Sequence, residues 1–152
     1  MTDTRSTIQH DSENLQNDHR ELMQGLAELD QALESLICYS EVYADLAGVQ
    51  RAQDTARRLA GRLPEHFVRE EQGVFAAIAL MGPDSAAFAQ EMRRQHTEIG
   101  TRIDAFCKAA ESFIDAPDLQ QSIGELKDAG RGLADFMAAH MGAEERRYAL
   151  LK

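Results

Sequence analysis

Hydrophobic residues recur every three or four positions through almost the whole chain, which places them on one face of an α-helix. Four stretches show this pattern, and their apolar positions are Leu15, Leu22, Leu26, Leu29 and Leu33; Leu59, Leu63, Val74 and Ala77; Phe88, Met92, Ile99, Ile103, Phe106 and Ala110; and Leu119, Ile123, Leu126, Leu133 and Met137. Strand signals are nearly absent, because no stretch alternates apolar with polar residues for long. The pattern predicts an all-α protein.

The breaks between these stretches carry helix start and stop signals. Gly82 and Pro83 follow the second stretch, and Asp84 or Ser85 is expected to cap the third helix. Pro117 lies near the first turn of the fourth, where its missing N–H costs nothing. Four helices with short connections predict an antiparallel four-helix bundle.

Pro64 lies inside the second stretch, where proline removes one backbone hydrogen bond and clashes with the preceding turn. With Gly61 nearby, we expect a kink here; the alternative is a helix that newly starts at Pro64. Either arrangement leaves His66 and Glu70 one turn apart on the same face.

The composition fits one soluble domain, with a polar N-terminal segment at residues 1–11 and the bundle at 12–152. The formal charge of -10 argues against nucleic acid and anionic membranes as partners. The N-terminus lacks the apolar centre of a secretion signal. Cys38 and Cys107 form no CxxC pair and suit a reducing compartment as small apolar fillers. We therefore expect a cytoplasmic protein.

Every histidine except His10 lies on an apolar stripe, and each predicted helix carries one of them: His19, His66, His96 and His140. Two His-x-x-x-Glu pairs, His66/Glu70 and His140/Glu144, place an imidazole and a carboxylate about 40° apart around a helix and about 6 Å apart along it. A single pair is a weak signal. Its doubling, joined to inward-facing histidines on the other two helices, indicates one shared layer and a helix hairpin used twice.

A cluster of four imidazoles and two carboxylates is costly in an apolar interior unless cations compensate it. Two divalent ions and a bridging hydroxide leave a modest residual charge on such a cluster. The donors are nitrogen and oxygen without thiolate, which suits iron, less specifically manganese or zinc, and disfavours calcium and magnesium. The sequence thus predicts a dinuclear metal centre.

Residues next to these candidates receive simpler interpretations. Glu71 and Glu145 turn about 100° away from the ligand glutamates and are expected to be solvated charges. Tyr148, one turn beyond Glu144, either hydrogen-bonds a bridging oxygen of the centre or packs in the core, and both interpretations remain open. Four small residues near the layer are expected to leave a path for ligands: Gly100, Ala138, Ala139 and Gly142.

The pattern H…HxxxE…H…HxxxE over residues 12–150 resembles the hemerythrin-like, or HHE cation-binding, family. The resemblance implies a non-haem di-iron centre with an oxo or hydroxo bridge, in which both glutamates bridge the irons. It implies these ligands: His19, His66, Glu70, His96, His140 and Glu144. Oxygen-carrying hemerythrins have HxxxH on the third helix and HxxxxD on the fourth; here one histidine is absent, which argues against reversible oxygen carriage. The spacing is similar to the di-iron domain of bacterial iron-centre repair (RIC) proteins.

The leading hypothesis is a protein that binds or senses O2, NO or H2O2 at an open iron position. The enzymatic alternative is peroxide removal or stress-linked iron-centre repair, and the sequence does not decide between binder and enzyme or identify a redox partner. A ferritin-like oxidase is disfavoured, because residues three before the histidines are never glutamate. A metal-free helical interaction protein is the remaining alternative.

Overall fold

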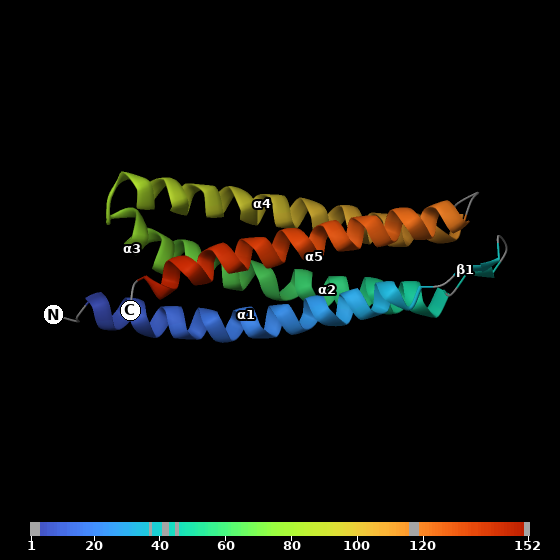
Figure 1. The fold of residues 1–152 in the computed structure, drawn as a ribbon, viewed down its shortest axis with the longest axis horizontal. Helices are drawn as coiled ribbons and strands as arrows, with labels where there is room; N and C mark the ends of the chain where they lie inside the picture. Colours follow the sequence, from blue (N-terminus) through green and yellow to red (C-terminus); the bar gives the residue numbers. More distant parts are fainter. Residues whose placement is uncertain (1–3, 37, 41–42, 45, 116–118, 151–152) are drawn as a thin grey trace.

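The computed structural model describes residues 4–36, 38–40, 43–44, 46–115 and 119–150, with backbone alone at 4–12, 38–40, 43–44, 46, 114–115 and 119–120. Four long helices lie side by side as an antiparallel bundle (Figure 1): α1 Thr4–Glu34, α2 Leu46–Arg69, α4 Pro83–Glu111 and α5 Leu119–Ala149. Helices α1 and α4 each pack against both α2 and α5. The predicted all-α bundle is confirmed. Within the described residues, no helix is both apolar and long enough to traverse a bilayer.

The N-terminal polar residues continue the first helix. Because α1 begins at Thr4, residues 4–11 are helical and run directly into the part that packs in the bundle. The side chain of His10, and Pro117 before α5, lie outside the described residues.

A short antiparallel hairpin connects α1 to α2 at one end of the bundle (Figure 1). Its strands are β1 (Cys38–Ser40) and β2 (Tyr43–Ala44). The sequence did not predict it, because strands of three and two residues are too short to show alternation. The Cys38 side chain lies outside the described residues. Cys107 is half-buried against the core, and burial raises the pKa of its thiol, as expected of an apolar filler.

The second helix continues through Pro64, so the alternative in which a helix starts there is wrong. Beyond Arg69 the backbone changes to a π-helical segment, η1 (Glu70–Val74), and then to a short α-helix, α3 (Phe75–Ala79). The Phe75 N–H donates to the carbonyl of Glu70, five residues back. A π turn holds one more residue than an α turn, and it begins here at a candidate metal ligand.

The start of α4 differs from the expectation. Gly82 is the N-cap, with φ of 145°, a value that favours glycine, and Pro83 follows in the first turn. The Ala86 N–H donates to the Gly82 carbonyl at 2.9 Å. The predicted cap at Asp84 or Ser85 is therefore wrong, because the helix starts earlier.

The apolar core consists of two parts. The larger cluster fills the bundle from the hairpin end towards the middle and includes Leu29, Leu33, Phe106, Leu126 and Leu133. The smaller lies at the end that holds both termini (Figure 1) and comprises Leu15, Val74, Phe75, Ile78, Ala89, Met92 and Tyr148. A layer of buried polar side chains comes between these clusters along the helices.

Candidate metal centre

The buried polar layer contains all six residues predicted from the sequence. His19 comes from α1, His66 from the end of α2, Glu70 from the start of η1 and His96 from α4, while α5 supplies His140 and Glu144. None is more than 5% exposed, and the two glutamates are fully buried. The structure therefore brings together side chains that lie up to 125 positions apart in the sequence, counted as 144 minus 19.

These six side chains form two groups of four potential ligands. One group is His19, His66, Glu70 and Glu144, and the other is Glu70, His96, His140 and Glu144. In each group the donor atoms lie within 4.8 Å of one another. Because both groups contain the same two glutamates, the arrangement fits two cations that share a pair of carboxylates.

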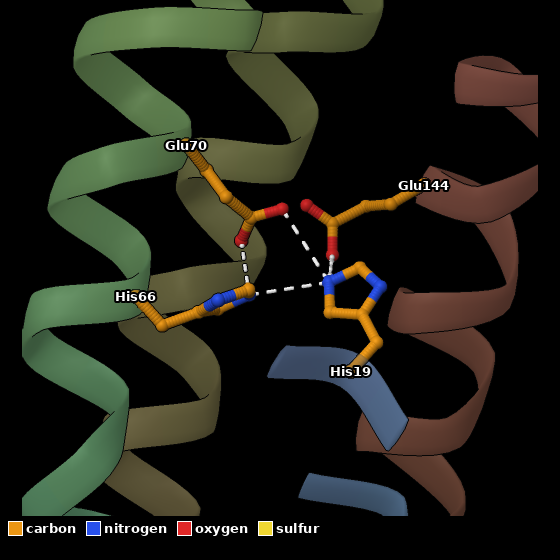
Figure 2. A group of neighbouring side chains, drawn as sticks. All are labelled: His19, His66, Glu70 and Glu144. Atoms are coloured by element: carbon orange, nitrogen blue, oxygen red, sulfur yellow. Dashed lines mark hydrogen bonds and ion pairs between the residues drawn. The ribbon is translucent and has the colours of Figure 1, made fainter. Parts of the chain in front are cut away.

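The first group is shown in Figure 2. The Nε2 atom of His66 lies 2.9 Å from Glu70 Oε1 and 3.1 Å from the Nε2 atom of His19. His19 Nε2 is also 3.5 Å from Glu144 Oε1 and 3.6 Å from Glu70 Oε2. Two imidazole nitrogens and two carboxylates thus converge on one point from four elements.

The second group repeats this geometry. The Nε2 atom of His140 lies 3.0 Å from Glu144 Oε1. His96 Nε2 is 3.3 Å from Glu70 Oε1 and 3.9 Å from Glu144 Oε2. The ring centroids of His96 and His140 are 4.9 Å apart, the same separation as between His19 and His66.

On the side facing away from the centre of the layer, each histidine donates a hydrogen bond from Nδ1. The acceptors are Glu145 for His19 (3.1 Å), Asp18 for His66 (3.1 Å), Glu71 for His96 (3.0 Å) and Gln95 for His140 (2.8 Å). These oxygens accept, so in the neutral ring the proton belongs on Nδ1 and the Nε2 lone pair faces inward. Such outer acceptors orient histidine ligands and raise their basicity.

The prediction that Glu71 and Glu145 are merely solvated charges is wrong. Both are partly exposed, at 36% and 43%, yet each carboxylate reaches a histidine on another helix. A helical-wheel argument places them relative to their own helix only and misses such contacts. Asp18 and Gln95 were also missed, although each directly precedes an inward-facing histidine, a doubled pattern visible in the sequence.

Tyr148 hydrogen-bonds the carboxylates and is fully buried. Its hydroxyl donates to Glu70 Oε2 at 2.5 Å and lies 3.3 Å from Glu144 Oε2, and its ring stacks on His19 at 6.2 Å. Burial and the adjacent carboxylates raise the pKa of Tyr148, so the phenol keeps its proton as a donor. Tyr148 therefore makes a polar contact with these carboxylates and does not merely pack in the core.

Two aromatic rings pack against the imidazole of His96. Phe67 stacks on His96 with ring centroids 3.8 Å apart and planes 11° apart, and Phe75 lies 5.4 Å from the same imidazole. Neither phenylalanine was predicted from the sequence to lie at the site. Phe67 directly follows His66 and is half-buried, so no simple pattern on its own helix indicated it.

Burial and mutual contact shift the pKa values of the acidic and basic groups in this layer. Burial raises the pKa of Glu144 to about 8, with neighbouring Glu70 adding to the rise, whereas burial lowers the pKa of His140 to about 3. Burial would also lower the pKa of His96, but Glu144 and Glu70 outweigh it and raise that pKa to about 9.

Four buried polar atoms in this layer have no hydrogen-bond partner among the described residues: Glu70 Oε1, His96 Nε2, His140 Nε2 and Glu144 Oε1. Unpaired polar atoms in a protein interior are rare and costly. All four point into the layer, where a cation would engage them. The nitrogen and oxygen donor set fits iron, and it lacks the thiolates that softer metals prefer.

A surface pocket of about 290 Å³ reaches the layer beside His66. It is lined by Asp18, Glu21, Leu22, Gly61, Arg62, Glu65, His66 and Arg69. The predicted path along Gly100, Ala138 and Ala139 is wrong, because these three residues are exposed on the outside of the bundle. Gly142, the fourth residue of that prediction, is half-buried.

Comparison with known proteins gives one match. The family model described as the hemerythrin HHE cation binding domain matches residues 10–151, a range that contains all six residues of the layer. No curated protein and no solved structure matched the chain.

Proposed function

The chain belongs to the hemerythrin HHE cation-binding family, and we propose that it holds two iron ions and binds or senses O2, NO or H2O2 at an open iron position. In this proposal His19 and His66 hold one ion, His96 and His140 hold the other, and both glutamates are shared. The observation that supports it is the pair of four-residue groups with Glu70 and Glu144 in common. A metal-free polar cluster that only supported the fold would not require four imidazole nitrogens that face a common centre.

The protein supplies fewer donors than two iron ions accept. Each position offers two histidines and two shared carboxylates, which is four protein ligands, whereas iron in nitrogen and oxygen sites commonly takes up to six. When bound, the iron pair supplies a redox-active Lewis-acid centre with room for O2, NO or H2O2.

The side chains around this centre make it suitable for binding a small uncharged ligand. Tyr148 holds the shared carboxylates by its hydroxyl. Phe67 and Phe75 pack against His96 and surround its ring with apolar groups. The pocket beside His66 gives the layer an approach from solvent. These features support small-molecule binding rather than a purely structural centre.

Iron stoichiometry tests the metal assignment. We expect anaerobically reconstituted protein to retain two irons per chain. His96→Ala and Glu144→Ala should hold less iron than the wild-type chain. His10→Ala, a control matched in residue type, should retain all of it, since position 10 is nine residues or about 13 Å along α1 from His19. Stable loading at one iron per chain, or equal iron in all variants, contradicts the proposal.

Spectroscopy tests ligand binding. The fully loaded ferrous protein should change its absorption spectrum on exposure to at least one of O2, NO and H2O2. Continuous O2 release from excess peroxide would identify turnover and make the protein an enzyme. If iron is present at two per chain and none of the three ligands alters the spectrum, the centre is structural.

A further inference from the structure

The outer acceptors of the four histidines follow a twofold pattern with one exception. In each hairpin, the residue before the first histidine accepts from the histidine of the HxxxE motif: Asp18 from His66, and Gln95 from His140. Glu71 and Glu145, each directly after a shared glutamate, accept from the remaining two histidines. Three acceptors are carboxylates, and Gln95 alone is an amide.

This exception makes the two proposed metal positions chemically different. Both histidines of the His19/His66 position donate to carboxylates, whereas at the His96/His140 position one donates to a carboxylate and the other to a neutral amide oxygen. A hydrogen bond to an ionised acceptor is roughly twice as strong as one between neutral groups. It leaves more electron density on the imidazole and makes Nε2 a better donor to a cation.

Arg69 moderates this difference but does not remove it. Its guanidinium lies 2.7 Å from Asp18 Oδ2, the same oxygen that accepts from His66. Arg69 is 48% exposed, so solvent screens its charge, while the carboxylate itself stays in direct contact with the imidazole at 3.1 Å.

We propose that the two metal positions differ in affinity, and that Asp18 and Gln95 set the order in which they fill. The His19/His66 position takes the first ion and the His96/His140 position takes the second. Asp18 and Gln95 are positioning residues, because they act through a histidine and do not contact the metal. This inference rests on the proposed dinuclear centre, and it predicts a range of metal concentrations in which the chain holds one ion.

Stepwise titration of the metal-free protein with Co²⁺ tests the proposal, since Co²⁺ accepts nitrogen and oxygen ligands and its visible bands report each occupied position. The wild-type chain should bind two ions in resolved steps, with dissociation constants that differ about 10-fold. This factor is the smallest change in metal affinity that is typical when an outer hydrogen-bond acceptor of a histidine ligand is replaced. Asp18→Asn should weaken the first step about 10-fold, and Gln95→Glu should tighten the second by a similar factor. The double variant should reverse the order.

Two single-position backgrounds assign each step. His140→Ala keeps the His19/His66 position intact, and there Asp18→Asn should lower Co²⁺ affinity. His66→Ala keeps the His96/His140 position, where Gln95→Glu should raise affinity and Asp18→Asn should have no effect, because its hydrogen-bond partner is gone. Circular dichroism checks that these chains are helical; if either background is unfolded, the titrations in the otherwise wild-type chain decide.

Control variants separate the contact from the charge. Asp30→Asn on α1 and Gln90→Glu on α4 make the same charge changes at exposed positions and should leave both steps unchanged. Arg69→Gln removes the ion pair but keeps the Asp18 carboxylate, so the first step should not weaken. If Arg69→Gln instead reproduces Asp18→Asn, Asp18 acts through the ion pair and the inference is wrong.

The remaining outcomes distinguish the inference from the function on which it rests. Two equal binding steps that neither Asp18→Asn nor Gln95→Glu alters would overturn the inference and leave a dinuclear centre in place. Failure of the wild-type chain to bind Co²⁺ and Fe²⁺ would overturn both.

Discussion

Replacing Tyr148 by phenylalanine removes one oxygen atom from the buried layer and keeps the ring. The hydroxyl donates to Glu70 at 2.5 Å and lies 3.3 Å from Glu144, so its loss leaves two buried carboxylates without this donor. A hydrogen bond to a charged group contributes about 1.5–3 kcal/mol. We therefore expect metal-free Tyr148→Phe to be less stable by about 2 kcal/mol, which corresponds to a Tm lower by about 4–8 °C for a domain of this size.

The loss of stability caused by Tyr148→Phe should depend on which other groups interact with the two carboxylates. In the iron-loaded protein the cations stabilise Glu70 and Glu144, so the same substitution should cost about half as much in the free energy of unfolding. In a metal-free Glu70→Gln background the acceptor is neutral, and the cost should fall to about 1 kcal/mol. Urea unfolding followed by circular dichroism measures all of these differences.

A double-mutant cycle gives the refuting result. If Tyr148→Phe costs the same with Glu70 and with glutamine at that position, the hydroxyl acts through packing and not through the carboxylate. A loss below about 0.5 kcal/mol in the metal-free wild-type background would show that water replaces the phenol, contrary to full burial of this side chain.

Three further predictions test the packing and the electrostatics of the centre. A Cβ at Gly130 would collide with Leu33 and lie 3.1 Å from Phe106, so Gly130→Ala should destabilise the fold by about 1–3 kcal/mol in urea unfolding. Gly124→Ala, on the same helix with nothing within 4 Å, should stabilise it by about 0.5–1 kcal/mol, and a stable Gly130→Ala chain would contradict the packing. The pKa of Glu144 at about 8 and that of His96 at about 9 mean that the metal-free protein holds both protons below pH 8, so metal binding should release at least two protons. Apparent affinity should therefore rise by at least about 100-fold per pH unit as the pH increases towards 8. Calorimetry in buffers of different ionisation enthalpy measures this release, and affinity that is flat between pH 6 and 8 would refute it. Iron at a thousandfold excess over Kd should add about 4 kcal/mol per occupied position to the stability of the wild-type chain, and His96→Ala should lose the contribution of the His96/His140 position, as thermal melts with and without chelator will show.

The helices and the inward-facing candidates could be predicted from the sequence because both depend on local periodicity. Leu22, Leu26 and Leu29 repeat at helical spacing, and His19 continues their stripe, so its inward direction follows without knowledge of the rest of the fold. The pairing of His66 with Glu70 and of His140 with Glu144 is equally local. Burial of all these side chains agrees with that reasoning.

The parts that could not be predicted depend on backbone detail or on contacts between helices. The π-helical turn after Arg69 changes which way the following residues face, and five residues carry no periodic signal of such a turn. The contact between Glu71 and His96 joins η1 to α4, and its existence depends on the rotation of both elements. Only the repetition of an acidic residue after each shared glutamate pointed towards it.

The division of the apolar core into two clusters has a consequence for local unfolding of the bundle. A layer of mutually repelling, incompletely paired groups separates the small cluster at the termini from the larger one. In the metal-free chain we expect the start of α1, the η1–α3 segment and the end of α5 to unfold locally while the rest stays native, so their amides should exchange with solvent first. Iron in the layer would couple the two clusters into one cooperative unit. The end of the bundle would then signal the metal content of the protein through its local order, which a protease or a partner can detect without contact with iron.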